Sequence, residues 1–145
     1  MSLTTFRNVS ASPRDPVDTW PFEALDETLE RGLVTDWEPI FDEVRARPWG
    51  AVARRVERWI RMSHGDPAAR LFTLALGRAR QRVEDDERDE VARQVREAIA
   101  ASGMNAGEFA ASVGTSASRL STYANGRVIP SATMLLRILR AGASA

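Results

Sequence analysis

Short polar residues and two arginines are concentrated in the stretch GTSASRLSTYANGR, which begins at Gly114. Hydroxyl groups can donate or accept hydrogen bonds, and the planar guanidinium group of arginine binds phosphates and carboxylates through paired donors. Packing against a core requires only Leu120 and Tyr123. The remaining polar side chains are therefore candidates for contact with a molecule outside the protein: Ser116, Ser118, Arg119, Thr122 and Arg127.

The charge of the chain is zero overall but is unevenly distributed. Residues 103–145 carry four arginines against the single Glu108, a balance of +3, whereas residues 1–102 carry 16 arginines against 19 acidic residues, a balance of −3. A polyanion would therefore bind to the C-terminal third. All 20 basic residues are arginine, which suits phosphate recognition, although a GC-rich coding bias gives the same composition.

The sequence contains no constellation of catalytic residues. It has no cysteine, which excludes disulfides, thiolate metal sites and cysteine nucleophiles. The only histidine, His64, is expected to end a helix. The acidic run of residues 84–90 lacks the glycine pattern of a calcium-binding loop. We therefore expect a protein that is not an enzyme and that has no metal and no cofactor.

Length and composition indicate a folded protein of one ordinary domain or two very small ones. The chain has 145 residues, of which 43% are hydrophobic and 28% charged. No apolar run approaches the ~20 residues that a membrane span needs. The first 18 residues lack the apolar centre of a secretion signal. We therefore expect a cytoplasmic location and no membrane partner.

Apolar residues recur at helical spacing, and no stretch alternates steadily between apolar and polar residues, so we predict an all-α fold. Residues 1–18 are polar and broken by Pro13 and Pro16, which predicts a flexible arm. Residues 19–90 are predicted to form a helical dimerisation or interaction domain, and residues 91–145 a separate C-terminal domain. A long helix is expected to join them.

The connecting stretch of residues 68–102 contains no proline. Opposite charges four residues apart, such as Arg80 and Glu84, would support an exposed helix there. One continuous helix and a helix that bends within the acidic run are both compatible with this pattern.

The C-terminal domain has helix-capping and turn residues at the spacing of a helix-turn-helix. Asn105 is expected to cap a short helix, and Gly114 stands where a tight turn needs a positive φ. A second short helix begins at Thr115 or Ser116, with Leu120 as its anchor. Small residues such as Ala110 let two short helices cross closely. The pattern predicts a helix-turn-helix between two supporting helices.

Residues 91–141 resemble the helix-turn-helix of Cro and lambda-repressor proteins, also called the XRE family. The resemblance implies a lambda-repressor-like domain that binds double-stranded DNA. Two positions depart from the family pattern, with Ala106 in place of a frequent glutamine and Ala124 in place of a frequent glutamate. The matching residues occur in the family's order: Phe109-Ala110, Val113-Gly114, Leu120, Asn125-Gly126 and Pro130.

The resemblance also implies which residues face DNA. Ala117, Ser118 and Thr122 match positions that reach base edges, and a methyl group or hydroxyl there can contact a base. Phosphate-contacting positions are matched by Asn105, Ser116 and Asn125. To these we add two cations on or just after the second motif helix, chosen from their position alone: Arg119 and Arg127.

Three functions are compatible with these features. The leading hypothesis is a transcriptional regulator, acting as a repressor and as a homodimer. The second is an antitoxin whose acidic N-terminal half binds a basic toxin, and the third is a protein-interaction module that does not bind DNA. The homodimer is predicted because the N-terminal domain has more apolar surface than it needs to bury internally, offered by six residues: Trp37, Phe41, Trp49, Val52, Val56 and Trp59.

Overall fold

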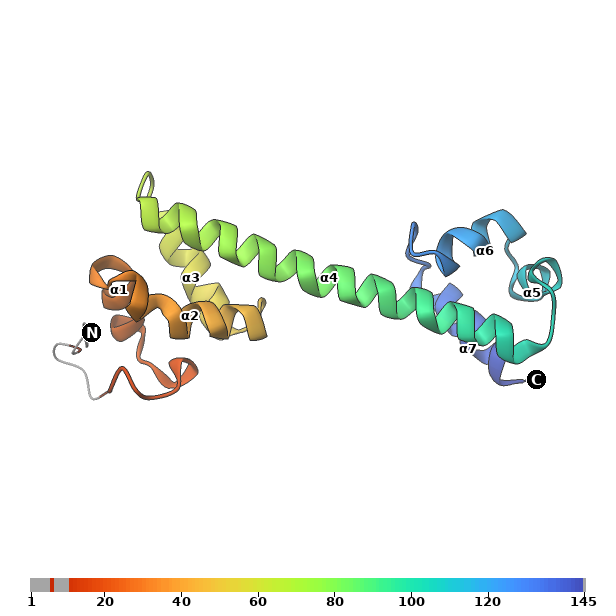
Figure 1. Ribbon diagram of the computed structural model, residues 1–145, viewed down its shortest axis with the longest axis horizontal. Coiled ribbons are helices and arrows are strands. Elements are labelled where there is room, and N and C mark those ends of the chain that lie inside the picture. Colours follow the sequence, from red (N-terminus) through yellow and green to blue (C-terminus); the bar gives the residue numbers. More distant parts are fainter. Residues whose placement is uncertain (1–5, 7–10, 145) are drawn as a thin grey trace. The chain divides into compact units, whose positions relative to one another are not determined.

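The computed structural model describes residue 6 and residues 11–144, and these residues form helices and no strand (Figure 1). The predicted all-α fold is confirmed for this part of the chain. The elements are a 3-10 helix, η1 (Val17–Thr19), and the α-helices α1 (Phe22–Arg31), α2 (Val34–Ala46), α3 (Ala51–Met62), α4 (Pro67–Ser102), α5 (Ala106–Val113), α6 (Ala117–Ala124) and α7 (Ala132–Ala143).

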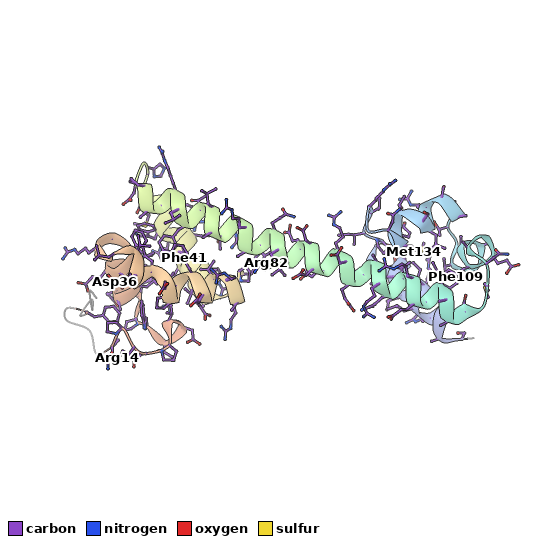
Figure 2. All side chains as sticks on the ribbon, viewed as in Figure 1. Arg14, Asp36, Phe41, Arg82, Phe109 and Met134 are labelled. Carbon is purple, nitrogen blue, oxygen red and sulfur yellow. The ribbon has the colours of Figure 1, made fainter. Side chains whose placement is uncertain are left out.

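The chain divides into two compact units between Arg82 and Val83. Helix α4 contributes residues to both units, and the connecting stretch is a single helix. The predicted domain boundary, between residues 90 and 91, lies further along the same helix. Phe41 and Phe109 belong to the two separate cores (Figure 2).

The N-terminal unit is built around Phe72 of α4, whose side chain is fully buried. The ring of Phe41 stacks on it with a centroid distance of 4.5 Å, and the rings of Trp37 and Trp59 meet it edge-on at 5.5 and 6.0 Å. Stacked and edge-on aromatic pairs add stability beyond the area that they bury. Helices α2, α3 and α4 are therefore joined through one aromatic cluster.

The apolar residues that predicted a dimer surface lie mostly inside this core, so that part of the prediction is wrong. The unit closes around its own aromatic side chains, which leaves few of them for a second copy. Only Trp49 is largely exposed, at 48% of its surface. The other five are buried or pack against the core: Trp37, Phe41, Val52, Val56 and Trp59.

The predicted arm of residues 1–18 is partly described. Residues 1–5 and 7–10 lie outside the described residues. Within the described part, Val17 is buried and the Phe6 ring meets the ring of Trp20 edge-on at 4.9 Å. The indole Nε1 of Trp20 donates a hydrogen bond to the carbonyl of Asp15 at 2.9 Å. This end of the predicted arm thus packs on the helices.

Arg80 of α4 joins the turn between α2 and α3 to α4. Its Nε donates to the carbonyl of Pro48 at 3.0 Å, and its Nη1 bonds the carboxylate of Glu57. The guanidinium also lies over the ring of Trp49, 5.8 Å from the centroid. The hydrogen bond from Arg80 lowers the pKa of Glu57. Arg80 therefore pairs with Glu57 of α3, and the predicted pair with Glu84 is not formed.

The C-terminal unit contains the second half of α4 with α5, α6 and α7. Its core holds Val95, Phe109, Leu120 and Ile138, each at most 1% exposed. These side chains come from all four helices. The two short helices α5 and α6 therefore rest on a base made by α4 and α7.

Candidate nucleic-acid interface

Helices α5 and α6 are joined by a tight turn at Gly114. Its φ is +81°, a left-handed conformation that glycine adopts without strain. The amides of Gly114 and Thr115 donate to the carbonyls of Ala111 and Ala110 at 3.2 and 2.9 Å, which closes the end of α5. The predicted turn and its positive φ are confirmed.

One face of helix α6 packs on the core of the unit, and the opposite face is exposed. Leu120 and Tyr123 are buried, with 1% and 5% of their surfaces exposed. The Ser116 Oγ accepts the amide of Arg119 at 3.1 Å and caps the helix. This arrangement leaves the side chains of Ala117, Ser118 and Arg119 exposed.

The hydroxyl groups of α6 are only partly available. Thr122 is half-buried, and its Oγ1 donates to the carbonyl of Arg119 at 2.6 Å. Since that bond uses its hydrogen, Thr122 can offer another molecule only acceptor sites and its methyl group. Ser118 is exposed, with its Oγ 3.3 Å from the Oγ of Ser116. Of the two predicted base contacts that carry a hydroxyl group, Ser118 is thus the freer.

Arg119 is directed along α6 by one hydrogen bond. Its Nε donates to the hydroxyl of Tyr123, one turn further on, at 3.0 Å. Within the described part of the chain, its two terminal nitrogens have no hydrogen-bond partner and its charge has no ion-pair partner. Both terminal nitrogens therefore remain available as donors.

Asn105 begins α5 as predicted. Its Oδ1 accepts the amide of Glu108 at 2.9 Å, while the Glu108 carboxylate accepts the amide of Asn105 at 3.4 Å. This reciprocal capping box satisfies two helix-end donors. Asn105 is an exposed residue, and its side-chain Nδ2 group stays available for an external acceptor.

The C-terminal end of α6 has no unsatisfied carbonyl group. The last four carbonyls of a helix lack helical partners. Here three of them accept bonds from amides of the loop that follows α6, at 3.0–3.3 Å. The fourth, that of Ala124, accepts a bond from Nη1 of Arg96 on α4 at 2.6 Å. A cation at this position also interacts favourably with the helix dipole.

The loop after α6 carries two more predicted contact residues, Asn125 and Arg127. The Oδ1 of Asn125 accepts the amide of Arg127 at 3.0 Å, which holds both residues in one turn. Gly126 has a φ of +77° and lies close to α4, because a Cβ there would be 3.7 Å from the Cβ of Ala92. The Arg127 side chain is exposed.

Residues 76–142 match the family model of a helix-turn-helix domain. This part of the chain is a helix-turn-helix domain. The match covers α5, α6 and all but the last residue of α7, and it is consistent with the resemblance to Cro and lambda-repressor proteins. No curated protein and no solved structure gave a match.

Two arginines that support the helix-turn-helix domain were not predicted from the sequence. Arg96 bonds the end of α6, and the Nη1 of Arg88 lies 3.5 Å from the carbonyl oxygen of Gly126. Both flank Ala92 at intervals of four residues, so the three share one ridge of α4. A small residue between two arginines is the sequence signal for this close approach.

Several acidic side chains lie along the edge of the domain that α4 forms. Hydrogen bonds from Arg93 and Gln94 lower the pKa of Glu90 to about 2, so this carboxylate is charged at neutral pH. Glu90 is ion-paired with Arg93, so the charges at this edge partly cancel. A cavity of about 450 Å³ opens here, lined by Asp86, Asp89, Glu90, Ala92, Arg93, Arg96 and Asn125.

The described residues show neither a metal site nor a membrane span. No three of their His, Asp or Glu side chains are grouped so that they could hold a metal ion. In the same residues, no helix combines the length and the apolar character of a membrane span. All eight predicted contact residues lie in the C-terminal unit: Asn105, Ser116, Ala117, Ser118, Arg119, Thr122, Asn125 and Arg127.

Proposed function

We propose that the protein is a sequence-specific DNA-binding transcriptional regulator that acts as a repressor. The observation that supports this proposal most directly is the exposed face of α6, held from below by Leu120 and Tyr123 within a helix-turn-helix domain. A helix presented in this way can enter the major groove of DNA. The proposed protein is cytoplasmic, has no enzymatic activity and uses no cofactor.

The side chains on and beside α6 divide by the part of DNA that each suits. Ala117, Ser118 and Arg119 are exposed on the first turn of α6 and suit base edges. Asn105 and Arg127 are exposed at the start of α5 and in the loop after α6, and they suit phosphates. The amino-terminal ends of α5 and α6 also carry partial positive charge, which favours anions.

The proposed regulator is a homodimer, because one module of this kind covers only half of a two-fold symmetric site. Leu71 and Leu74 lie one turn apart on α4 and expose 41% and 57% of their surfaces. They suit the dimer interface better than the buried aromatic residues do. We expect sedimentation at micromolar concentration to show a dimer.

The double substitution Leu71→Ser and Leu74→Ser should then shift the protein towards monomer, because it removes apolar surface from the interface. The control is Arg54→Ala, a change at an exposed position of α3. A wild-type protein that stays monomeric with and without DNA would contradict the dimer.

An antitoxin is the second candidate, and the surface of the N-terminal unit favours it. Leu33, Val34 and Met62 are large apolar residues with 58%, 64% and 76% of their surfaces exposed. Residues 1–102 also have a net charge of −3. Such a surface suits a basic toxin. A purified complex with the product of a neighbouring gene, formed through residues 1–82, would distinguish an antitoxin from a simple repressor.

Replacement of Arg127 by alanine should weaken binding to all DNA sequences equally. We suggest selecting duplexes from a random pool with the wild-type protein and measuring binding to a selected and a scrambled duplex at several salt concentrations. Each phosphate contact contributes roughly −0.9 to the slope of log K against log salt. We therefore expect Arg127→Ala to reduce the steepness of both slopes by about one unit.

Arg140→Ala is the matched control, because it removes the same charge from an exposed position near the end of α7. It should leave both slopes nearly unchanged. Equal slopes for wild type and Arg127→Ala would remove Arg127 from the interface. A wild-type protein without salt-dependent DNA binding would contradict the regulator and support the protein-interaction module.

A further inference from the structure

Tyr123 carries a hydroxyl group that the core does not require. Its side chain is 5% exposed and packs in the apolar cluster with Phe109, Leu120 and Ile138. A phenylalanine ring would fill the same space. In the described part of the chain, the hydroxyl has one hydrogen-bond partner, the Nε of Arg119 at 3.0 Å.

That single bond determines which edge of the Arg119 guanidinium remains free. A guanidinium has five N–H donors in a fixed plane. Tyr123 occupies the donor on Nε, which excludes a paired contact made through Nε and a terminal nitrogen. The two terminal nitrogens keep their four donors, two of which point outward from the edge that these nitrogens form. This edge can bond the O6 and N7 acceptors of guanine in the major groove.

We infer that the Tyr123 hydroxyl is a positioning group for Arg119, and that it presents the outer edge of the guanidinium to a guanine in the DNA site. The inference rests on the proposed function. Tyr123 is itself a buried residue that contacts no DNA. It acts by restricting the flexible Arg119 side chain before binding, so that this side chain loses less conformational entropy when DNA binds.

Charge supports this assignment. The ion pairs of the described residues involve Arg45, Arg47, Arg80 and Arg93. Arg119 has no carboxylate partner among them, so its charge is not neutralised within the protein. A neutral partner on Nε orients the group and leaves its full charge for an external acceptor.

The substitution Tyr123→Phe tests the inference, since it removes one oxygen and keeps the ring. We expect binding to the selected duplex to weaken about 3–10-fold, while binding to a scrambled duplex changes less than about twofold. In an Arg119→Ala background, Tyr123→Phe should have no further effect. A purely structural role would weaken both duplexes and would persist in that background.

A measurement without DNA tests the bond itself. In the wild-type protein, the Nε–H of Arg119 should give an NMR signal protected from exchange with water, and Tyr123→Phe should abolish the protection. Ser121→Ala is the control, because it removes an exposed hydroxyl from the same helix. It should leave both the protection and the discrimination between duplexes unchanged.

The outcomes separate the two proposals. Equal duplex discrimination in wild type and Tyr123→Phe would overturn the positioning role and leave the proposed function intact. A wild-type protein that binds neither duplex would overturn the proposed function, and the positioning role with it.

Discussion

The substitution Phe72→Ala is expected to lower the free energy of unfolding of the N-terminal unit by about 3–5 kcal/mol. The side chain is fully buried and touches three other aromatic rings, those of Trp37, Phe41 and Trp59. The loss therefore combines the transfer of a large apolar group with a cavity that rigid rings cannot readily fill. Denaturant unfolding followed by tryptophan fluorescence measures this change.

Tryptophan fluorescence reports on the N-terminal unit alone, because all four tryptophans precede residue 60. Arg70→Ala is the control, since it truncates an exposed side chain on the same helix and should change the free energy by less than about 0.5 kcal/mol. A loss below about 1 kcal/mol for Phe72→Ala would show that the aromatic cluster does not hold this unit together.

Local patterns were sufficient to predict the helices and the shape of the motif. Periodic apolar residues identified Leu120 and Tyr123 as core residues, and both are buried. Asn105 and Gly114 marked helix ends because capping and positive φ depend on residue type over a few positions. These features need no knowledge of what packs against them.

Contacts between distant segments could not be predicted in the same way. The sequence offered Glu84 as a partner for Arg80 at helical spacing, but Arg80 bonds Glu57 and the carbonyl of Pro48. Those partners come close only after α3 has packed on α4. For the same reason, Trp59 looked available for a dimer interface, whereas the unit uses it in its own core.

At the candidate interface, too, local features were predicted and contacts between distant segments were not. The eight predicted contact residues all lie in the helix-turn-helix domain, since the order of small, apolar and glycine residues defines α5, the turn and α6. The bonds that restrain individual side chains were missed. Arg96 reaches Ala124 from another helix, and the Tyr123 hydroxyl had no visible role without the position of Arg119.

The substitution Gly142→Ala is expected to destabilise the helix-turn-helix domain by about 1–3 kcal/mol. Gly142 of α7 is buried against α4, and a Cβ there would lie 2.7, 2.8 and 2.9 Å from the Cα, Cβ and carbonyl oxygen of Ala98. The atoms that the new Cβ would meet belong to the backbone and Cβ of Ala98, so they cannot move aside without moving α4. The two helices must therefore separate, although alanine favours a helix by up to about 1 kcal/mol over glycine.

Hydrogen exchange of amides in α7 and in residues 91–102 of α4 measures this change, because the slowest amides report the unfolding of the unit. Gly107→Ala is the matched control in the same unit. Its Cβ would be 3.5 Å from the Oδ1 of Asn105, an ordinary contact, so we expect a gain of about 0.4–1 kcal/mol. The two substitutions add the same methyl group and should therefore change stability in opposite directions. A gain in both would mean that α7 can move away from Ala98 at little cost, and that the close approach of α4 and α7 is not what holds the domain together.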